Sequence, residues 1–398
     1  MQSISFEQSF SDSKLEYKPW RSLVLIAFLI SITRVNLLPD INFPAWLAAD
    51  GLAFLIALKR QEEFIKTLDR NKLLLSVPVL SLLSSLWSLT PISTAYHAVQ
   101  FVFVILVAIA LFPKFGLFDL LKCIFLYNFI IQFGSLYVYF SGGYWPEGFP
   151  GAYLHKNLLG MFSTLQIITA FVLFVNGWNR ILCLLSIVLA VLLLILSASG
   201  TSLVLSVAIW ALFPFARTIQ KGMTKTFMTI GSLGILFSLV GFYLVSGVRI
   251  EIVDGILNLL GKDSSLTGRS VLWDYAMLAI PKNQWFGIGF LAYWDSPFTT
   301  AAGLQNEMQQ DLRMFHNVYI EVAVALGFIG AMLFTLTLVQ QILRSILYFI
   351  ERDDYLSAYP FVFLVWIAAL SMTENPIYGV LPMQFILATV VISSFASR

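Results

Sequence analysis

The sequence predicts an all-α polytopic membrane protein with about twelve transmembrane helices and one large periplasmic loop. The first observation is composition. The chain has 398 residues, of which 59% are hydrophobic and 12% charged, and that charged share is about half of what an ordinary soluble domain carries. The second is pattern, because the apolar stretches are continuous rather than alternating. Together these observations exclude a soluble globule, a disordered chain and a transmembrane β-barrel.

The apolar runs define the predicted elements in order. A spanning helix needs roughly 20 apolar residues, so we count each run of about that length as one helix. The predicted helices fall at about 22–38, 44–58, 72–88, 95–112, 116–141, 158–176, 180–198, 201–216, 227–247, 316–342, 355–372 and 378–395.

Lysines and arginines orient these helices. Most of the 24 basic residues fall on one side of the predicted membrane, together with both termini. An excess of positive charge in short loops marks the cytoplasmic side, so we expect cytoplasmic termini and an even number of spans. The predicted organisation is a cytoplasmic tail (1–20), transmembrane helices 1 to 9 (21–247), a large periplasmic loop (248–315) and transmembrane helices 10 to 12 (316–398).

Polar chemistry gathers in the only two substantial outward-facing loops. His155 and Lys156 end one of them, whereas Arg269 lies within the large periplasmic loop and His316 follows directly after it. Each residue has an ordinary alternative explanation, since basic side chains near helix ends reach for lipid headgroups. Two of the three histidines nevertheless share one face with two cations, which favours a functional site there.

Several classes of site are not indicated. The net charge of +2 gives no nucleic-acid footprint. Cys123 and Cys183 lie in apolar runs and imply neither a disulfide nor a metal site. The Gly287-x-Gly289 pair lacks the preceding strand of a dinucleotide-binding fingerprint. With no metal-binding motif either, we expect no metal and no cofactor.

Two motifs in the middle of the chain resemble those of a known family. His155-Lys156-Asn157-x-Leu-Gly resembles the HKN-x-LG element of exopolysaccharide polymerases, and Ser197-x-Ser199-x-Thr201 resembles their S-x-S-x-T segment.

Further motifs follow in the second half. Thr267-Gly-Arg269, with Trp273 four residues on, is similar to TGR-x-x-x-W, and His316-Asn317-x-Tyr319 resembles part of the C-terminal signature. Asn283, Gly287-x-Gly289 and Gly327…Gly330 look like the rest of that signature. From the order and spacing of these motifs, the chain resembles the O-antigen ligase and polymerase superfamily over roughly residues 75–395.

This resemblance implies a metal-independent, inverting membrane glycosyltransferase of C-type architecture in the bacterial inner membrane, with an extracytoplasmic active site. Its donor would be an oligosaccharide on undecaprenyl pyrophosphate, and its acceptor a second glycan or lipid A–core. The family's arginine carries over to Arg269 and its catalytic histidine to His316. Ligases often place a further arginine where this chain has Gly200, so we expect Lys156 to supply the second charge on the pyrophosphate.

The residue chemistry suits these roles. An arginine fork holds phosphate oxygens in a bidentate fashion, and a neutral imidazole accepts a proton from an attacking hydroxyl near pH 7. Asn317 is expected to orient His316 or the acceptor, and Glu321 to hold Arg269 or His316. Supporting positions in the matched motifs are His155, Asn157, Thr201, Trp273 and Tyr319.

Two alternatives stay open. Motif and composition leave the polymerase and the ligase unresolved, although the HKN and S-x-S-x-T forms look more like polymerases. A lipid-linked oligosaccharide flippase also has about twelve spans, but transporters place polar groups near the midplane in two matching halves. Here only one half of the chain carries the large loop.

Overall fold

The structure is a computed structural model, and it describes residues 51, 55, 61–111, 116–143, 145–146, 148–153, 155–218, 269–308, 312–352 and 354–374. The predicted tail 1–20 and the predicted helices at 22–38, 44–58, 227–247 and 378–395 lie wholly or almost wholly outside these residues. Within the described part, every regular element is a helix.

The longer described helices follow the predicted apolar runs closely, whereas the helices at 61–70, 269–279, 292–295 and 301–308 lie in segments predicted as loops. Their bounds are α3 Gln61–Arg70, α4 Lys72–Leu83, α5 Pro91–Leu111, α6 Leu117–Phe140, α7 Lys156–Val175, α8 Arg180–Leu196, α9 Gly200–Thr218, α12 Arg269–Ala279, α13 Ala292–Asp295, α14 Ala301–Met308, α15 Val318–Arg352 and α16 Tyr355–Leu370. Four described helices are long and apolar enough to cross a membrane: Pro91–Ala110, Leu117–Phe140, Lys156–Val175 and Val318–Ile350. The count of twelve spans stays a prediction.

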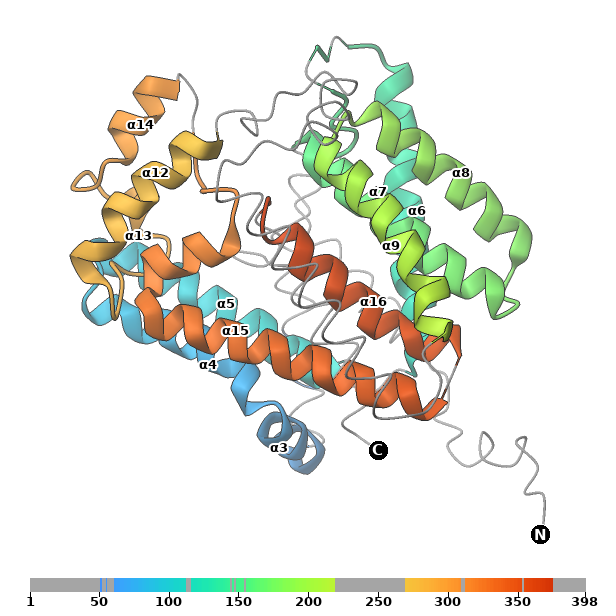
Figure 1. Cartoon of the computed structure of the whole chain (residues 1–398), viewed down its shortest axis with the longest axis horizontal. Coiled ribbons are helices and arrows are strands. Elements are labelled where there is room, and N and C mark those ends of the chain that lie inside the picture. Colours follow the sequence, from blue (N-terminus) through green and yellow to red (C-terminus); the bar gives the residue numbers. More distant parts are fainter. Residues whose placement is uncertain are drawn as a thin grey trace.

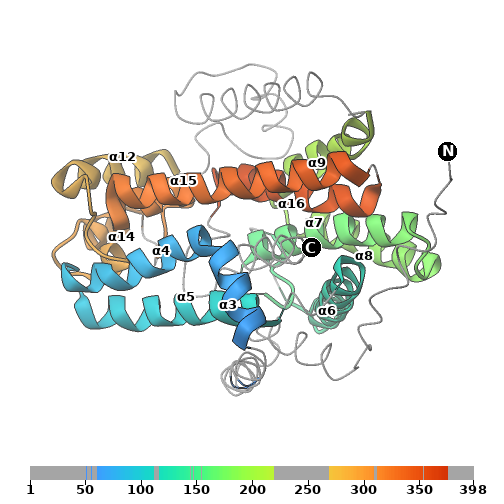
Figure 2. The same cartoon turned by 90° about the horizontal axis from the view of Figure 1, so that it is seen from below.

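α16 is the central helix. Its sixteen residues are apolar almost throughout, and nearly all of them are buried, as expected for a helix surrounded by others. It packs against α15 on one side and against α7 and α9 on the other. It therefore joins two groups of helices, α4, α5 and α15 in one and α6 to α9 in the other (Figures 1 and 2).

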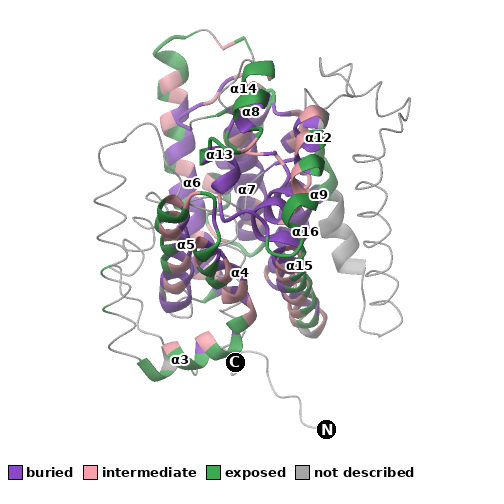
Figure 3. Ribbon diagram, turned by 90° about the vertical axis from the view of Figure 1, so that its left-hand side faces the viewer, coloured by how far each residue is buried: buried purple, intermediate pink, exposed green. Residues whose placement is uncertain are grey.

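The outer faces of the helices are apolar as well as exposed. On α8, Ile181, Val188 and Ile195 recur every seven residues and are each at least 60% exposed. Figure 3 shows such exposed positions on the outward faces and the buried positions between the helices. Apolar side chains repeated along one exposed face of a helix are typical of contact with lipid.

α12, α13 and α14 form a separate layer at one end of the molecule (Figure 1). They share a second hydrophobic cluster with the start of α15, built around Trp273, Trp294 and Phe315. The described part of the predicted large loop is therefore helical and has its own core. At the opposite end of α15, the Arg344 guanidinium donates to the Arg70 carbonyl (3.0 Å) and to Asn71 Oδ1 (3.2 Å).

α15 is interrupted at Gly327, whose φ of 67° and ψ of −167° are not helical. The segment 284–289 fills the interruption. The amides of Ile288 and Gly289 donate to the carbonyls of Val324 and Ala325 (3.2 and 2.9 Å). The break therefore leaves a short first helix, residues 318–326, that can point in its own direction.

Candidate active site

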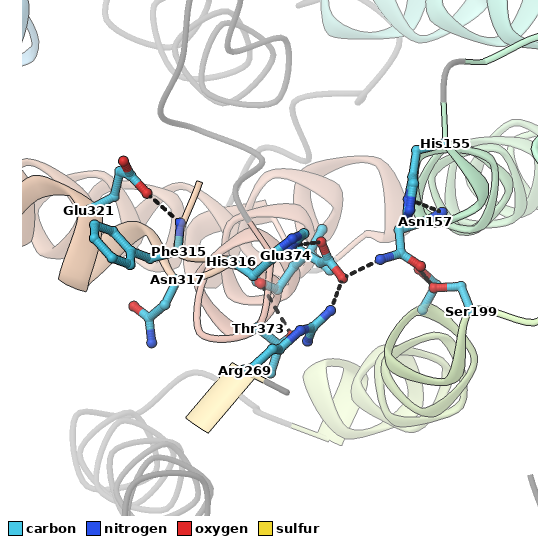
Figure 4. A network of polar contacts seen from close by, with 12 residues as sticks. His155, Asn157, Ser199, Arg269, Phe315, His316, Asn317, Glu321, Thr373 and Glu374 are labelled. Carbon is cyan, nitrogen blue, oxygen red and sulfur yellow. Dashed lines mark hydrogen bonds and ion pairs between the residues drawn. The ribbon is translucent and has the colours of Figure 1, made fainter. Parts of the chain in front are cut away.

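Three helix ends meet beside the layer of α12 to α14. They are the start of α7, the start of α15 and the end of α16. The start of α12 lies beside these three ends (Figures 1 and 4). Each end contributes polar side chains, because backbone groups at helix ends lack intrahelical partners and favour polar neighbours.

Arg269 is the first residue of α12 and is 8% exposed. One of its guanidinium nitrogens, Nη2, donates to Glu374 Oε1. A buried arginine requires a partner of opposite charge, and Glu374 supplies it. The predicted charge at position 269 thus lies at the meeting point of the helix ends.

Glu374 lies just beyond α16 and binds three side chains. Besides Arg269, Oε1 accepts from Asn157 Nδ2 (2.8 Å), and Oε2 lies 3.2 Å from His316 Nδ1 (Figure 4). Burial raises the pKa of Glu374, but the charge of Arg269 and the hydrogen bond and charge of His316 outweigh it, so its pKa lies below the ordinary value. Glu374 is therefore ionised at neutral pH.

Sequence reasoning missed Glu374. It matches none of the motifs and is one of 22 acidic residues. The one available signal was its place, since it follows a long apolar run directly and precedes Asn375-Pro376. An acid at the end of a span is expected to have a partner or to face a wet cavity.

His316 has an unusual backbone conformation for a side chain with a Cβ, with φ of +53°. Such left-handed residues cost roughly 1–2 kcal/mol and persist where their surroundings hold them. The next two residues are fixed to the end of α16. Asn317 Nδ2 donates to the Met372 carbonyl (3.0 Å), and the Val318 amide to the Ser371 carbonyl (2.9 Å).

Asn317 also caps α15. Its Oδ1 accepts from the Ile320 amide (3.1 Å), which satisfies one of the free donors of the first turn. Both the nitrogen and the oxygen of its side-chain amide are thereby bonded to backbone groups. In this structure Asn317 therefore fixes the position of the segment that carries His316. It makes no side-chain hydrogen bond to His316 itself.

Glu321 does not contact Arg269 or His316, and in this respect the expectation was wrong. Its carboxylate accepts from Trp294 Nε1 and from the Phe315 amide, each at 2.8 Å. Phe315 is also held through its carbonyl, to which Trp273 Nε1 donates (3.0 Å). Trp273 is buried in the second hydrophobic cluster.

The other predicted residues occupy varied places. His155 is exposed, and its Nδ1 accepts from the Asn157 amide (3.2 Å) at the start of α7. Lys156 is half-buried as the first residue of that helix, and Thr201 is half-buried at the start of α9. The Tyr319 hydroxyl donates to the Ala368 carbonyl of α16 (3.3 Å). Of the HKN element, Asn157 is the residue that binds Glu374.

Among the residues that the structure describes, no group of three or more His, Cys, Asp or Glu side chains is arranged to hold a metal ion. Arg269, His316, Asn157 and Glu374 instead make a cluster of one cation, one imidazole, one amide and one carboxylate, which suits an anionic ligand and proton transfer.

The chain is similar in sequence to a known protein family and to a known protein. Residues 158–335 match the model of the O-antigen ligase family. This chain is therefore similar to the O-antigen ligase family over this region. It is also 34% identical over 199 residues to the exopolysaccharide production protein ExoQ of Rhizobium meliloti (strain 1021), and the match covers 48% of this chain and 45% of ExoQ.

The matched region contains Arg269 and His316 but ends before Glu374. The predicted resemblance to the ligase and polymerase superfamily is confirmed. With its apolar helices, the chain is a multi-pass helical membrane protein. The chain spans about half the length of the curated relative that it matches.

Proposed function

We propose that this protein is a membrane glycosyltransferase that joins oligosaccharide units carried on undecaprenyl pyrophosphate, in the manner of a polysaccharide polymerase. The observation that carries the proposal is that Arg269 and His316 bind opposite oxygens of one buried carboxylate, Glu374. This arrangement puts a phosphate-binding group and a proton acceptor side by side. The match to the O-antigen ligase family and the similarity to ExoQ support the same class of reaction.

Arg269 would bind the leaving group. In the transfer, the bond between the donor sugar carbon and the pyrophosphate oxygen breaks, and negative charge grows on undecaprenyl pyrophosphate as it leaves. A fixed guanidinium stabilises that charge more strongly in the transition state than in the ground state. Nη2 is engaged by Glu374, so the rest of the guanidinium fork is the part proposed to meet phosphate. We propose Lys156 as the second positive charge.

His316 would act as the general base. A carboxylate accepts hydrogen bonds only, so the contact from Glu374 Oε2 to Nδ1 means that a neutral imidazole here carries its proton on Nδ1. Nε2 is then the nitrogen that takes the proton of the acceptor hydroxyl. The hydroxyl oxygen bonds to the donor sugar carbon from the face opposite the leaving group, which inverts that centre.

The membrane arrangement completes the proposal. We infer about twelve spans, cytoplasmic termini and an active site on the outer face of the bacterial inner membrane. The basic cluster of Arg70 and Arg344 at the end of α15 away from His316 supports this direction, because positive charge marks the cytoplasmic side. No metal and no cofactor is needed by the proposed chemistry.

A ligase is the second candidate, since the matching family model is described by that activity. A ligase would use the same donor and site but transfer the finished chain to lipid A–core or another acceptor. The polymerase is preferred because of the similarity to an exopolysaccharide production protein and the HKN and S-x-S-x-T motifs.

Product analysis in cells that lack the gene distinguishes these functions. A polymerase predicts that long chains disappear while single repeat units remain on lipid, and that the wild-type gene but not His316→Ala restores them. Long chains that accumulate without an acceptor would indicate a ligase. Repeat units trapped on the cytoplasmic leaflet would indicate a flippase and contradict the proposal.

A further inference from the structure

Glu321 is a buried carboxylate that lies outside the Glu374 cluster. It is 2% exposed and sits one turn into α15, on the side of the α12 to α14 layer. Each carboxylate oxygen accepts one hydrogen bond, Oε1 from the Trp294 indole and Oε2 from the Phe315 amide. Burying a carboxylate costs free energy even when it is hydrogen-bonded. An apolar residue would fill this place in a hydrophobic cluster at a lower free-energy cost.

The hydrogen bond from the Phe315 amide to Glu321 holds the residue that directly precedes His316. The Phe315 amide donates to Glu321 and its carbonyl accepts from Trp273, so both backbone polar groups of Phe315 are held by buried side chains. Phe315 itself is fully buried between the rings of Tyr293 and Trp294. Its peptide plane therefore has little freedom.

His316 depends on that fixed peptide. Its left-handed φ of +53° is a conformation that a residue with a Cβ adopts only where neighbours impose it. On one side Asn317 and Val318 are tied to the end of α16, and on the other side Phe315 is tied to Glu321. Figure 4 shows Glu321 and Glu374 on opposite sides of the 315–317 segment.

We propose that Glu321 is a positioning residue, which sets the direction of the His316 imidazole through the Phe315 amide. The inference rests on the proposed function, because it assigns Glu321 a part in proton transfer by His316. Glu321 touches neither donor nor acceptor. Its loss therefore lowers the rate of the transfer step and leaves the binding of the lipid-linked donor unchanged.

A carboxylate is specifically required at this position. Both partners of Glu321, an indole N–H and a peptide N–H, are donors only. Glutamine has nearly the same shape, but its NH₂ group would face one of these donors, and two buried donors cannot pair. If Glu321 served only to fill space, glutamine would replace it without effect. The Glu321→Gln substitution thus separates positioning from packing.

The test measures kcat and KM in proteoliposomes, with the undecaprenyl-pyrophosphate-linked oligosaccharide isolated from cells lacking the gene as substrate. We expect Glu321→Gln to lower kcat by about 10- to 100-fold, since small misplacements of catalytic groups have effects of that size, and to leave the KM for the lipid donor within about twofold. Glu307→Gln is the matched control. Glu307 belongs to the same layer but is exposed, and its carboxylate accepts a hydrogen bond from the Tyr275 hydroxyl (2.7 Å). We expect this control variant to keep the wild-type kcat.

A second variant keeps the test decisive if Glu321→Gln alone folds poorly. In the double variant Glu321→Gln/Trp294→Phe, the glutamine oxygen accepts from the Phe315 amide and its NH₂ meets no donor. We expect the kcat of the double variant to lie within about threefold of the kcat of Trp294→Phe alone. The effects of the two substitutions are then not additive, as is expected for residues that contact each other.

The outcomes separate this inference from the proposed function. Wild-type kcat in Glu321→Gln, with His316→Ala inactive, would overturn the positioning role and leave the proposed function intact. A double variant as slow as a folded Glu321→Gln would also overturn it. If the wild-type protein shows no glycan transfer at all, the proposed function itself fails.

Discussion

Glu374 is the residue on which the arrangement of the cluster depends, because it is the only described side chain that contacts both Arg269 and His316. It also reaches Asn157 on α7, so one carboxylate just beyond α16 links α7, α12 and His316, two residues before α15. A buried ion pair contributes little net stability compared with a well-packed apolar pair, but breaking one by removing a partner leaves an uncompensated charge.

Removal of the Glu374 carboxylate is therefore expected to be costly. Glu374→Ala should lower the free energy of unfolding by about 3–5 kcal/mol, because Arg269 is left buried without its partner. Thermal unfolding of the purified protein in detergent measures this. Asp119→Ala is the control, since Asp119 pairs with Lys122 on a partly exposed face of α6 and should cost less than about 1 kcal/mol. Equal losses in the two variants would contradict the account.

The same residue predicts a dependence of stability on pH. The pKa of Glu374 is lower in the folded protein than the ordinary carboxyl value, so its contribution is full above that ordinary value and is lost as pH falls through the folded pKa. The melting temperature of the wild type should exceed that of Glu374→Gln by a constant amount near neutral pH. The difference should shrink below about pH 4. A difference that does not shrink below about pH 4 would show that the carboxylate is not stabilised by cations.

At the scale of the element, the break in α15 sets where His316 lies. Gly287 and Gly327 face one another across it, both with φ of 67°. A Cβ on Gly287 would lie 2.3 Å from the carbonyl carbon of Ala325, and one on Gly327 would lie 2.3 Å from that of Trp285. Two backbones therefore touch where glycine alone fits, and they pair through hydrogen bonds. Only glycine combines this contact with a left-handed backbone at no steric cost.

Gly287→Ala should accordingly separate segment 284–289 from α15. We expect a loss of about 2–4 kcal/mol in stability, because the new methyl group meets backbone atoms that cannot move aside, and a lower kcat, because the 318–326 helix shifts. Gly303→Ala on α14 is the control. A Cβ there meets nothing within 4 Å, and alanine in a helix is up to about 1 kcal/mol more favourable than glycine. Wild-type stability in Gly287→Ala would show that the backbones of segment 284–289 and α15 are not in close contact.

Across the whole molecule, the proposed orientation places the α12 to α14 layer and the basic cluster of Arg70 and Arg344 on opposite sides of the membrane. Single cysteines test this. Asn306→Cys on α14 and Lys72→Cys at the start of α4 both occupy exposed positions, and the native Cys123 and Cys183 are buried. An impermeant maleimide added to intact spheroplasts should label Asn306→Cys and not Lys72→Cys. Labelling of Lys72→Cys alone would invert the proposed orientation.

Much of the architecture could be predicted from the sequence. Continuous apolar runs predicted the described long helices, because a lipid environment permits few other structures. Arg269 and His316 were predicted from short motifs, and the structure places both on Glu374. Glu374 could not be predicted, since it contacts Arg269 across 105 residues and no motif surrounds it. The partners of Glu321 were mistaken for the same reason, because its contact with the indole of Trp294 arises from the packing of the α12 to α14 layer.

The most direct test of the central claim is the rate of glycan transfer by purified protein in liposomes, measured for the wild type, His316→Ala and Arg269→Ala with the lipid-linked oligosaccharide as substrate. We expect His316→Ala to bind the donor normally but to transfer at least about 10²-fold more slowly, and Arg269→Ala to lose about 10²–10³-fold in rate. A correctly inserted His316→Ala protein that elongates glycan at the wild-type rate would contradict the account.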